Sequence, residues 1–204
     1  MIICVSDNIW FQSGLSELVQ HCASHRGAFY SLSYQKAKSA LAEMTWDKSA
    51  TIVVDYTSPD HSLLFSLLKI KRQSANNSIL VVTKNEQLAD VAENIVLDSV
   101  ADCLIDTRES CEKLNDFMTK GLEGQVVSKS VTNKIWARIK KNACLTHREI
   151  DMIPFIIAGK GNKEISRQVD ISEKMVSIHR RNIYNKLHVG NLTGLYHYFT
   201  GEVK

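Results

Sequence analysis

The chain has 204 residues, of which 44% are hydrophobic and 23% charged, and its formal net charge is +3. This composition is typical of a folded globular protein and excludes disordered, collagen-like and low-complexity chains. The sequence has five cysteines without a C-x-x-C pair, no basic segment before an N-terminal apolar run and no apolar run of the ~18 residues that a membrane span needs. We therefore expect a cytoplasmic protein with reduced thiols and no membrane contact.

Short apolar runs alternate with amphipathic stretches over the first 120 residues. The runs are Ile2–Val5, Ala28–Leu32, Thr51–Val54, Ile79–Val82 and Cys103–Ile105. They are rich in β-branched residues, as strands buried on both faces are, and we expect Cys4 and Cys103 to be buried within them. Each run precedes a stretch with apolar residues at helical spacing, such as Leu15, Leu18 and Val19. Five such repeats predict a doubly wound α/β domain with a parallel sheet.

Three polar side chains stand where these strands end. Asp7 follows the first strand, Asp55 ends the third and Thr83 ends the fourth. Ligands of open parallel sheets collect at the carboxyl ends of the strands. The arrangement, with the segment Val54-Asp55-Tyr56-Thr57-Ser58-Pro59, resembles the receiver domain of two-component response regulators. This resemblance implies that Asp55 is the phosphoacceptor, that Thr83 contacts the phosphoryl group and that neighbouring carboxylates bind Mg²⁺.

The chain departs from the receiver pattern at two places. Ser6-Asp7 replaces a pair of acidic residues, and Asp106 or Thr107 replaces the lysine that follows the fifth strand in that family. A missing carboxylate weakens a Mg²⁺ site, and an added anion repels a phosphoryl group. We therefore expect a receiver-like domain without ordinary aspartyl phosphorylation. We also expect no metal or cofactor, except that Mg²⁺ would bind if the pocket were active. The alternative is a response regulator switched by phosphorylation of Asp55.

Charge is unevenly distributed along the chain. Residues 1–120 contain 11 basic residues (Lys and Arg) and 15 acidic residues (Asp and Glu). Residues 121–144 contain 5 basic residues and 1 acidic residue, and residues 145–204 contain 9 basic and 6 acidic residues. A basic back half indicates contact with a polyanion, with a merely solvated basic face as the alternative. We expect a receiver-like domain over residues 1–122, a linker over 123–143 with a short helix around Trp136, and a helical domain over 144–204.

Helix signals replace the strand pattern from residue 145 onward. Thr146 and Glu149 form a T-x-x-E capping box, and Gly159 and Gly161 end the helix that it begins. Pro154 lies inside this helix and predicts a kink, because proline lacks the backbone N–H group and clashes with the preceding turn.

Two further helices are predicted on either side of a short turn. Asn162 is expected to cap the first, and Ser172 to cap the second, which spans about Glu173–His188. A helical wheel places an apolar set on one side: Val176, Ile183 and Leu187. A mostly polar set lies broadly opposite: Lys174, Ser177, Ile178, Arg181 and Asn185. A basic, amide and hydroxyl stripe is typical of a helix that reads the major groove of DNA.

Three segments of this region, Leu145–Glu149, Asn162–Ile165 and Val176–Leu187, resemble the DNA-binding domain of the LuxR/FixJ (NarL-type) transcription regulators. The resemblance implies a cytoplasmic transcription regulator that binds double-stranded DNA. The implied base-reading residues are Ser177, Ile178 and Arg181. The implied phosphate contacts are Asn162, Lys163, Lys174, His179, Arg180 and Lys186.

Several of these residues have a second interpretation. His179 could be a half-buried packing residue, and Arg181 a solvated surface charge. Ile178 could contact a thymine methyl group or be an ordinary exposed apolar residue. Arg180 lies nearer the apolar side of the wheel, so we expect its side chain to extend toward the DNA backbone.

The last predicted helix, Leu192–Phe199, has apolar residues at the spacing of one helical face. The corresponding helix joins two DNA-binding domains in the family, which implies a homodimer or a heterodimer with a related regulator. A partner subunit that scarcely binds DNA alone is a further alternative. The sequence contains no catalytic motif with the residue spacing of an enzyme family, so we do not expect an enzyme.

Overall fold

The computed structural model describes residues 1–21, 28–43, 50–57, 61–73, 77–84, 91–120, 139 and 145–200. The chain divides into two compact units, a sheet unit of residues 1–89 and 100–128 and a helical unit of residues 90–99 and 129–204. The domain limits expected at residues 122 and 143 stay a prediction. Most of the expected linker helix, Trp136 included, lies outside the described residues.

Five parallel strands form the centre of the sheet unit. They are β1 (Ile2–Val5), β2 (Phe29–Leu32), β3 (Thr51–Asp55), β4 (Ser78–Thr83) and β5 (Cys103–Asp106). Their order is β2-β1-β3-β4-β5, and every neighbouring pair is parallel. The predicted doubly wound sheet is confirmed, and β3, β4 and β5 each extend one residue further at the carboxyl end than the apolar runs indicated.

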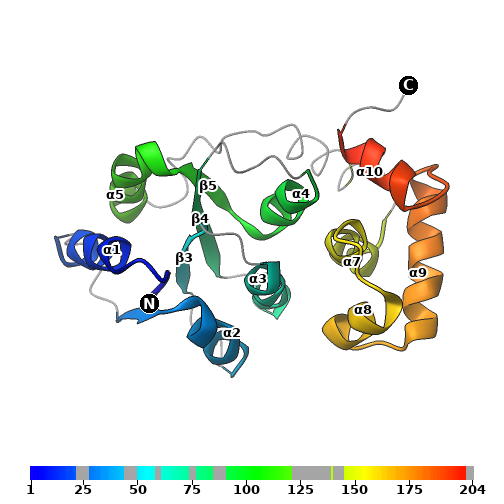
Figure 1. Ribbon diagram of the computed structural model, residues 1–204, viewed down its shortest axis with the longest axis horizontal. Coiled ribbons are helices and arrows are strands. Elements are labelled where there is room, and N and C mark those ends of the chain that lie inside the picture. Colours follow the sequence, from blue (N-terminus) through cyan, green and yellow to red (C-terminus); the bar gives the residue numbers. More distant parts are fainter. Residues whose placement is uncertain are drawn as a thin grey trace. The chain divides into compact units, whose positions relative to one another are not determined.

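Helices follow each strand, as predicted. They are α1 (Ile9–His21), α2 (Tyr34–Glu43), α3 (His61–Gln73), α4 (Val91–Val100) and α5 (Ser110–Lys120), the last preceded by a 3-10 helix η2 (Thr107–Glu109). Helices α1 and α5 lie on one side of the sheet and α2 and α3 on the other (Figure 1). The carboxyl ends of the strands therefore lead into helices on both faces.

The core between the sheet and the helices α1 and α5 is apolar. It contains Ile2, Cys4, Leu15, Val19, Val53, Leu80, Val82, Cys103, Ile105, Leu114, Phe117 and Met118. The expected burial of Cys4 and Cys103 is confirmed. Burial, and to a smaller extent the charge of Asp55, raises the pKa of the Cys4 thiol to about 12, so this thiol stays protonated at neutral pH.

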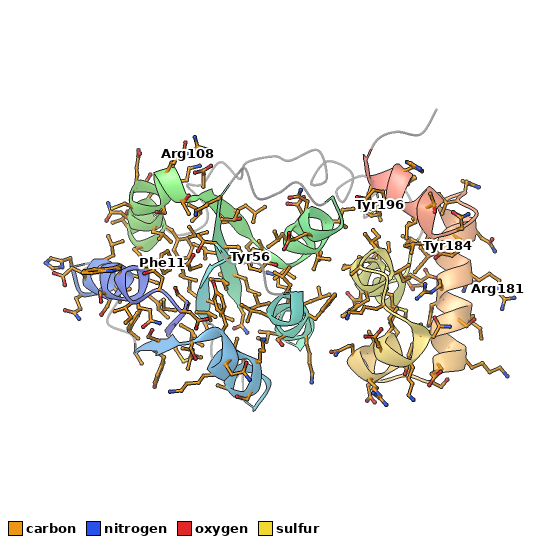
Figure 2. All side chains as sticks on the ribbon, viewed as in Figure 1. Phe11, Tyr56, Arg108, Arg181, Tyr184 and Tyr196 are labelled. Carbon is orange, nitrogen blue, oxygen red and sulfur yellow. The ribbon has the colours of Figure 1, made fainter. Side chains whose placement is uncertain are left out.

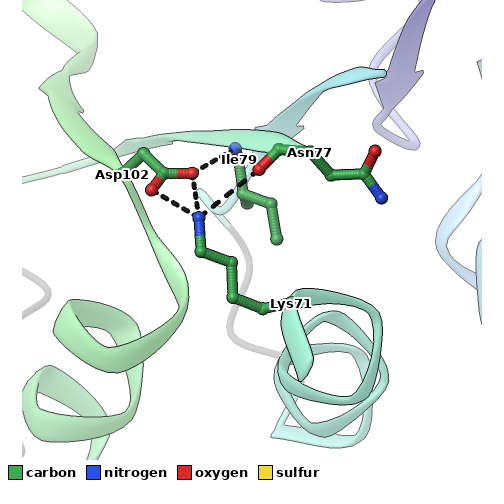
Figure 3. Close-up of polar contacts among 4 residues, drawn as sticks. All are labelled: Lys71, Asn77, Ile79 and Asp102. Carbon is green, nitrogen blue, oxygen red and sulfur yellow. Dashed lines mark hydrogen bonds and ion pairs between the residues drawn. The ribbon is translucent and has the colours of Figure 1, made fainter. Parts of the chain in front are cut away.

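A polar cluster joins α3 to the amino-terminal ends of the central strands (Figure 3). The Asp102 carboxylate accepts hydrogen bonds from the Ile79 N–H group at 2.8 Å and from the Lys71 ammonium group. Lys71 also donates to the Asn77 carbonyl at 3.4 Å, and the Asn77 side-chain oxygen accepts from Ala50 N–H at 3.1 Å. These bonds fix the end of the sheet opposite to the one with Asp55.

The helical unit contains a helix-turn-helix, as the sequence predicted. Its C-terminal helices are α7 (His147–Ile157), α8 (Asn162–Val169), α9 (Glu173–Lys186) and α10 (Leu192–Thr200). Helix α9 ends two residues before the expected His188, whose backbone turns to a φ of 56°. Within the described residues, no helix is long and apolar enough to cross a bilayer.

The ends of α7 follow the local signals in the sequence. The Thr146 hydroxyl accepts from Glu149 N–H at 3.3 Å while the Glu149 carboxylate accepts from Thr146 N–H at 2.8 Å, which confirms the capping box. Gly159 follows the helix with a φ of +73°, a conformation that glycine adopts without a steric cost. The helix continues through Pro154, and its kink stays a prediction.

The predicted cap of α8 is wrong by one residue. Gly161 is the N-cap, and Asn162 is already the first helical residue. The Glu164 carboxylate accepts a hydrogen bond from Gly161 N–H at 3.0 Å and so satisfies a free donor of the first turn without an asparagine cap. Ser172 caps α9 as predicted, by accepting from Met175 N–H at 3.3 Å.

Candidate nucleic-acid interface

Helix α9 has one side inside the helical unit. Val176, Ile183 and Leu187 are buried, which confirms the apolar side of the predicted wheel. Full burial of such side chains stabilises a fold by about 1.5–3 kcal/mol each. Because these residues fix the rotation of α9 about its axis, they also determine which residues face solvent.

The opposite side of α9 is open. Lys174, Ser177, Arg181 and Asn185 are exposed, and Ile178 is half-exposed. Arg181 points away from α7 and α8 (Figure 2). Lys163, in the first turn of α8, is also exposed, and in the described part of the chain the side chains of Lys163, Lys174 and Arg181 have no hydrogen-bond or ion-pair partner. Their charges are therefore available to an external anion.

Arg180 does not extend outward as expected. Its Nη2 atom donates to the Lys160 carbonyl at 2.8 Å, in the turn between α7 and α8. Its Nε atom is buried without a hydrogen-bond partner among the described residues. The Lys160 carbonyl lies outside both helices, and the guanidinium group satisfies this acceptor. The structure thus assigns Arg180 an internal bond, and its contact with phosphate stays a prediction.

Lys186 also has an internal partner. Its Nζ atom lies 2.8 Å from Glu149 Oε2, and the Glu149 side chain is only 2% exposed. Burial alone would raise the pKa of Glu149, but hydrogen bonds from Lys186 and Thr146 and the lysine charge outweigh it and lower the pKa below its ordinary value. The pair joins the start of α7 to the end of α9, and phosphate binding by Lys186 stays a prediction.

The two remaining implied phosphate contacts are less accessible. Asn162 and His179 are half-buried. The His179 Nδ1 atom is buried without a hydrogen-bond partner among the described residues, which agrees with the packing interpretation for that face of the ring. Direct contact of either residue with DNA stays a prediction.

The apolar stripe of α10 is divided between core and surface. Leu195 and Phe199 are fully buried, whereas Leu192 and Tyr196 are half-exposed. The exposed part of the stripe is the surface on which an interface between two copies would form. That interface stays a prediction.

At the other candidate site, the sheet brings Asp55 and Thr83 to adjacent strand ends. Asp55 pairs with Val82 across β3 and β4, one residue before Thr83. Asp55 is 2% exposed, and its Oδ2 atom accepts from the Ser6 hydroxyl at 2.8 Å while Oδ1 accepts from Thr57 N–H at 3.3 Å. The Thr83 hydroxyl is buried without a partner among the described residues.

The two other acidic residues at these strand ends, Asp7 and Asp106, have partners of their own. Asp7 is exposed, and its Oδ1 atom accepts from Tyr34 N–H at 3.0 Å, at the start of α2. Asp106 caps η2 by accepting from Arg108 N–H at 2.8 Å. In the part of the chain that the structure describes, no group of three or more His, Cys, Asp or Glu side chains could bind a metal ion.

Two features of these sites were not predicted from the sequence. Ser6 was recognised as the replacement of an acidic residue, but not as the donor to Asp55. The pairing of Lys186 with Glu149 has no signal in the sequence, because the two residues are 37 positions apart.

Comparisons with known proteins agree with both units. Residues 143–199 match the family described as bacterial regulatory proteins, luxR family. The nitrate/nitrite response regulator protein NarP of Escherichia coli is 28% identical over 145 residues, which are 68% of this chain but only 66% of NarP, just under two thirds of its length. The response regulator protein VraR of Staphylococcus epidermidis is 29% identical over 161 residues, 76% of each chain.

The chain is also similar to a solved structure of the RcsB response regulator of Salmonella typhimurium, with a TM-score of 0.50 and 20% sequence identity. The alignment covers 100% of this chain and 98% of the RcsB chain. At this identity the likeness shows the fold. Residues 143–199 thus match the luxR family, and most of the chain is similar to response regulators such as NarP and VraR.

Proposed function

We propose that the chain is a sequence-specific DNA-binding transcription regulator whose receiver-like domain is not controlled by ordinary phosphorylation of Asp55. The open side of α9 is the observation that supports DNA binding. Its apolar side is buried within the helical unit, whereas Lys174, Ser177 and Arg181 extend into solvent. A basic, polar helix face of this kind complements the major groove.

The exposed residues divide into two roles under this proposal. Arg181 has the geometry to donate two hydrogen bonds to a guanine, and Ser177 can bond to a base edge. Lys163 and Lys174 neutralise phosphates and set the register of the protein on the duplex. Arg180 and Lys186, whose side chains bond to Lys160 and Glu149, fix the frame that presents α9.

Selection of bound duplexes from a random pool by the full chain tests this function. We expect a defined sequence to be enriched, and Arg181→Ala to weaken binding to it by about 1–3 kcal/mol, measured by fluorescence anisotropy. Arg148→Ala is the matched control, because it removes an exposed arginine from α7 of the same unit. Equal, salt-independent binding of wild type and Arg181→Ala would refute the assignment.

Two features of the sheet unit support control without phosphorylation. The residues at the strand ends do not fit the Mg²⁺ site of a receiver, because Ser6 replaces a carboxylate and donates to Asp55, and Asp7 bonds to the start of α2. The Asp55 carboxylate that would attack a phosphodonor is therefore already a hydrogen-bond acceptor inside the fold. Asp106, an anion, stands at the end of β5.

A phosphorylation switch at Asp55 is the second candidate, and the unpartnered Thr83 hydroxyl beside it favours that function. Incubation of the full chain with a small phosphodonor and Mg²⁺, followed by intact-mass measurement, separates the two. We expect no stable adduct. An adduct of one phosphoryl group that Asp55→Asn abolishes would establish the switch instead.

The regulator is further proposed to act in the cytoplasm as a dimer, with no cofactor and no catalytic activity of its own. The half-exposed Leu192 and Tyr196 of α10 support a surface for pairing. Sedimentation of the purified chain, alone and with the selected duplex, checks this. A chain that binds DNA only with a related regulator present would instead be a heterodimer subunit.

A further inference from the structure

Met175 is exposed on the helix that we propose reads DNA. Of the four large apolar side chains exposed in the described residues, it alone lies in the helical unit, with 42% of its surface accessible. Its backbone is fixed, because its N–H group donates to the hydroxyl of the capping residue Ser172 at 3.3 Å. The side chain therefore starts from a rigid first turn.

Met175 has an apolar neighbour on the same helix. Ile178 is half-exposed, and residues three positions apart are adjacent on a helix surface. Lys174 and Arg181, both exposed, lie next to Ile178 on the side away from Met175, and at about 100° per residue the acidic Glu173 falls on the opposite side of the helix from Met175. An apolar pair with two cations beside it complements a partner whose anions and apolar groups lie next to one another.

We propose that Met175 and Ile178 together contact the 5-methyl group of a thymine in the major groove, which makes Met175 a specificity-determining residue. The inference rests on the proposed DNA-binding function. A duplex has the required chemistry, since its phosphates pair with Lys174, a guanine accepts hydrogen bonds from Arg181, and thymine is the base with a methyl group in the major groove. Methionine suits this contact because its side chain is flexible and polarisable.

Replacement of single thymines by uracil tests the contact, because uracil lacks only the methyl group. In the duplex selected by the full chain, each dT is replaced in turn by dU, and Kd is measured by fluorescence anisotropy. For the wild type we expect about fourfold weaker binding at one or two adjacent positions, the effect of one methyl group removed from water. Met175→Ala should bring this ratio close to one, whereas Met175→Leu should largely preserve it.

Trp10→Ala is the matched control, since it removes an exposed apolar side chain from the sheet unit and should leave both Kd and the ratio unchanged. Circular dichroism of each variant checks that the fold is intact. Wild-type protein that binds its selected duplex equally well with uracil at every position would overturn this inference and leave the proposed function standing. Failure to select any sequence would overturn both.

Discussion

The sheet unit and the helical unit each bury a carboxylate next to a candidate site, but the two carboxylates have different partners. Asp55 accepts hydrogen bonds from neutral groups, the Ser6 hydroxyl and the Thr57 N–H. Glu149 accepts from the Lys186 ammonium group as well as from Thr146 N–H. Hydrogen bonds from a charged donor compensate the burial of an anion more strongly than bonds from neutral donors do.

The two units also differ in which of their polar and charged side chains bond within the fold. In the helical unit, Arg180 and Lys186 bond within the fold, whereas the side chains of Lys163, Lys174 and Arg181 have no partner among the described residues and stay available to an external anion. In the sheet unit, Asp55 and Asp7 accept from the Ser6 hydroxyl and from backbone N–H groups, and no cation among the described residues contacts Asp55. The carboxylate of the receiver-like site is enclosed by its partners, whereas the side of α9 with Lys174 and Arg181 is open.

Removal of the lysine in the helical unit should have the largest effect. Lys186→Met leaves the buried Glu149 without its charged partner, and we expect the free energy of unfolding to fall by about 2 kcal/mol. Amide hydrogen exchange in α7 and α9 measures this within the helical unit alone. Lys163→Met, which removes an exposed lysine, is the control. If Lys186→Met were as stable as the wild type, the contrast between the two carboxylates would disappear.

A pH titration sharpens the same contrast. The pKa of Glu149 in the folded state lies below its ordinary value of 4.5, so its stabilising effect is present above that value and is lost as the pH falls through the folded pKa. We expect the melting temperature, followed by circular dichroism, to fall over this window, and less so in Lys186→Met.

The pKa of Glu164 is also lowered, by hydrogen bonds from Gly161 and Lys160, but this group is exposed. Glu164→Gln should therefore keep most of the pH dependence. If Glu164→Gln removed all of the pH dependence, the effect would arise from Glu164 in α8 and not from the Glu149–Lys186 pair.

The next effect is electrostatic and concerns the open side. Lys163→Ala should weaken binding to all duplexes alike and reduce the slope of log K against log salt by about 0.9, because one phosphate is no longer neutralised by the protein. Anisotropy titrations at several salt concentrations measure the slope, and Lys163→Arg should restore it. Weaker binding to the selected sequence alone would show that Lys163 reads bases.

The smallest effect on DNA binding is expected in the sheet unit. Under the proposed function, Asp55→Asn should change the DNA affinity by less than about twofold, with or without a phosphodonor, because no phosphoryl group on Asp55 controls DNA binding. Ser6→Ala, which removes one of the two donors to the Asp55 carboxylate, should cost about 1 kcal/mol in the stability of the sheet unit and leave DNA binding unchanged. A large change in affinity on Asp55→Asn would mean that the two units are coupled.

Local patterns in the sequence determined the elements. The β-branched runs became the five strands, and the T-x-x-E box and Ser172 became caps because their hydrogen bonds join residues three positions apart. The spacing of Val176, Ile183 and Leu187 was enough to predict the buried side of α9. The cap of α8 was misplaced by one residue, because Gly161 and Asn162 are both acceptable N-caps and the Glu164 bond decides between them.

Only the tertiary structure decided which polar residues remain free. The Arg180–Lys160 bond joins residues 20 positions apart, the Lys186–Glu149 pair 37 and the Ser6–Asp55 bond 49. No local periodicity encodes such partners, since they meet only after the helices and strands have packed. A sequence therefore identifies which side chains have suitable chemistry, but the packed chain determines which of them it uses internally and which remain for a ligand.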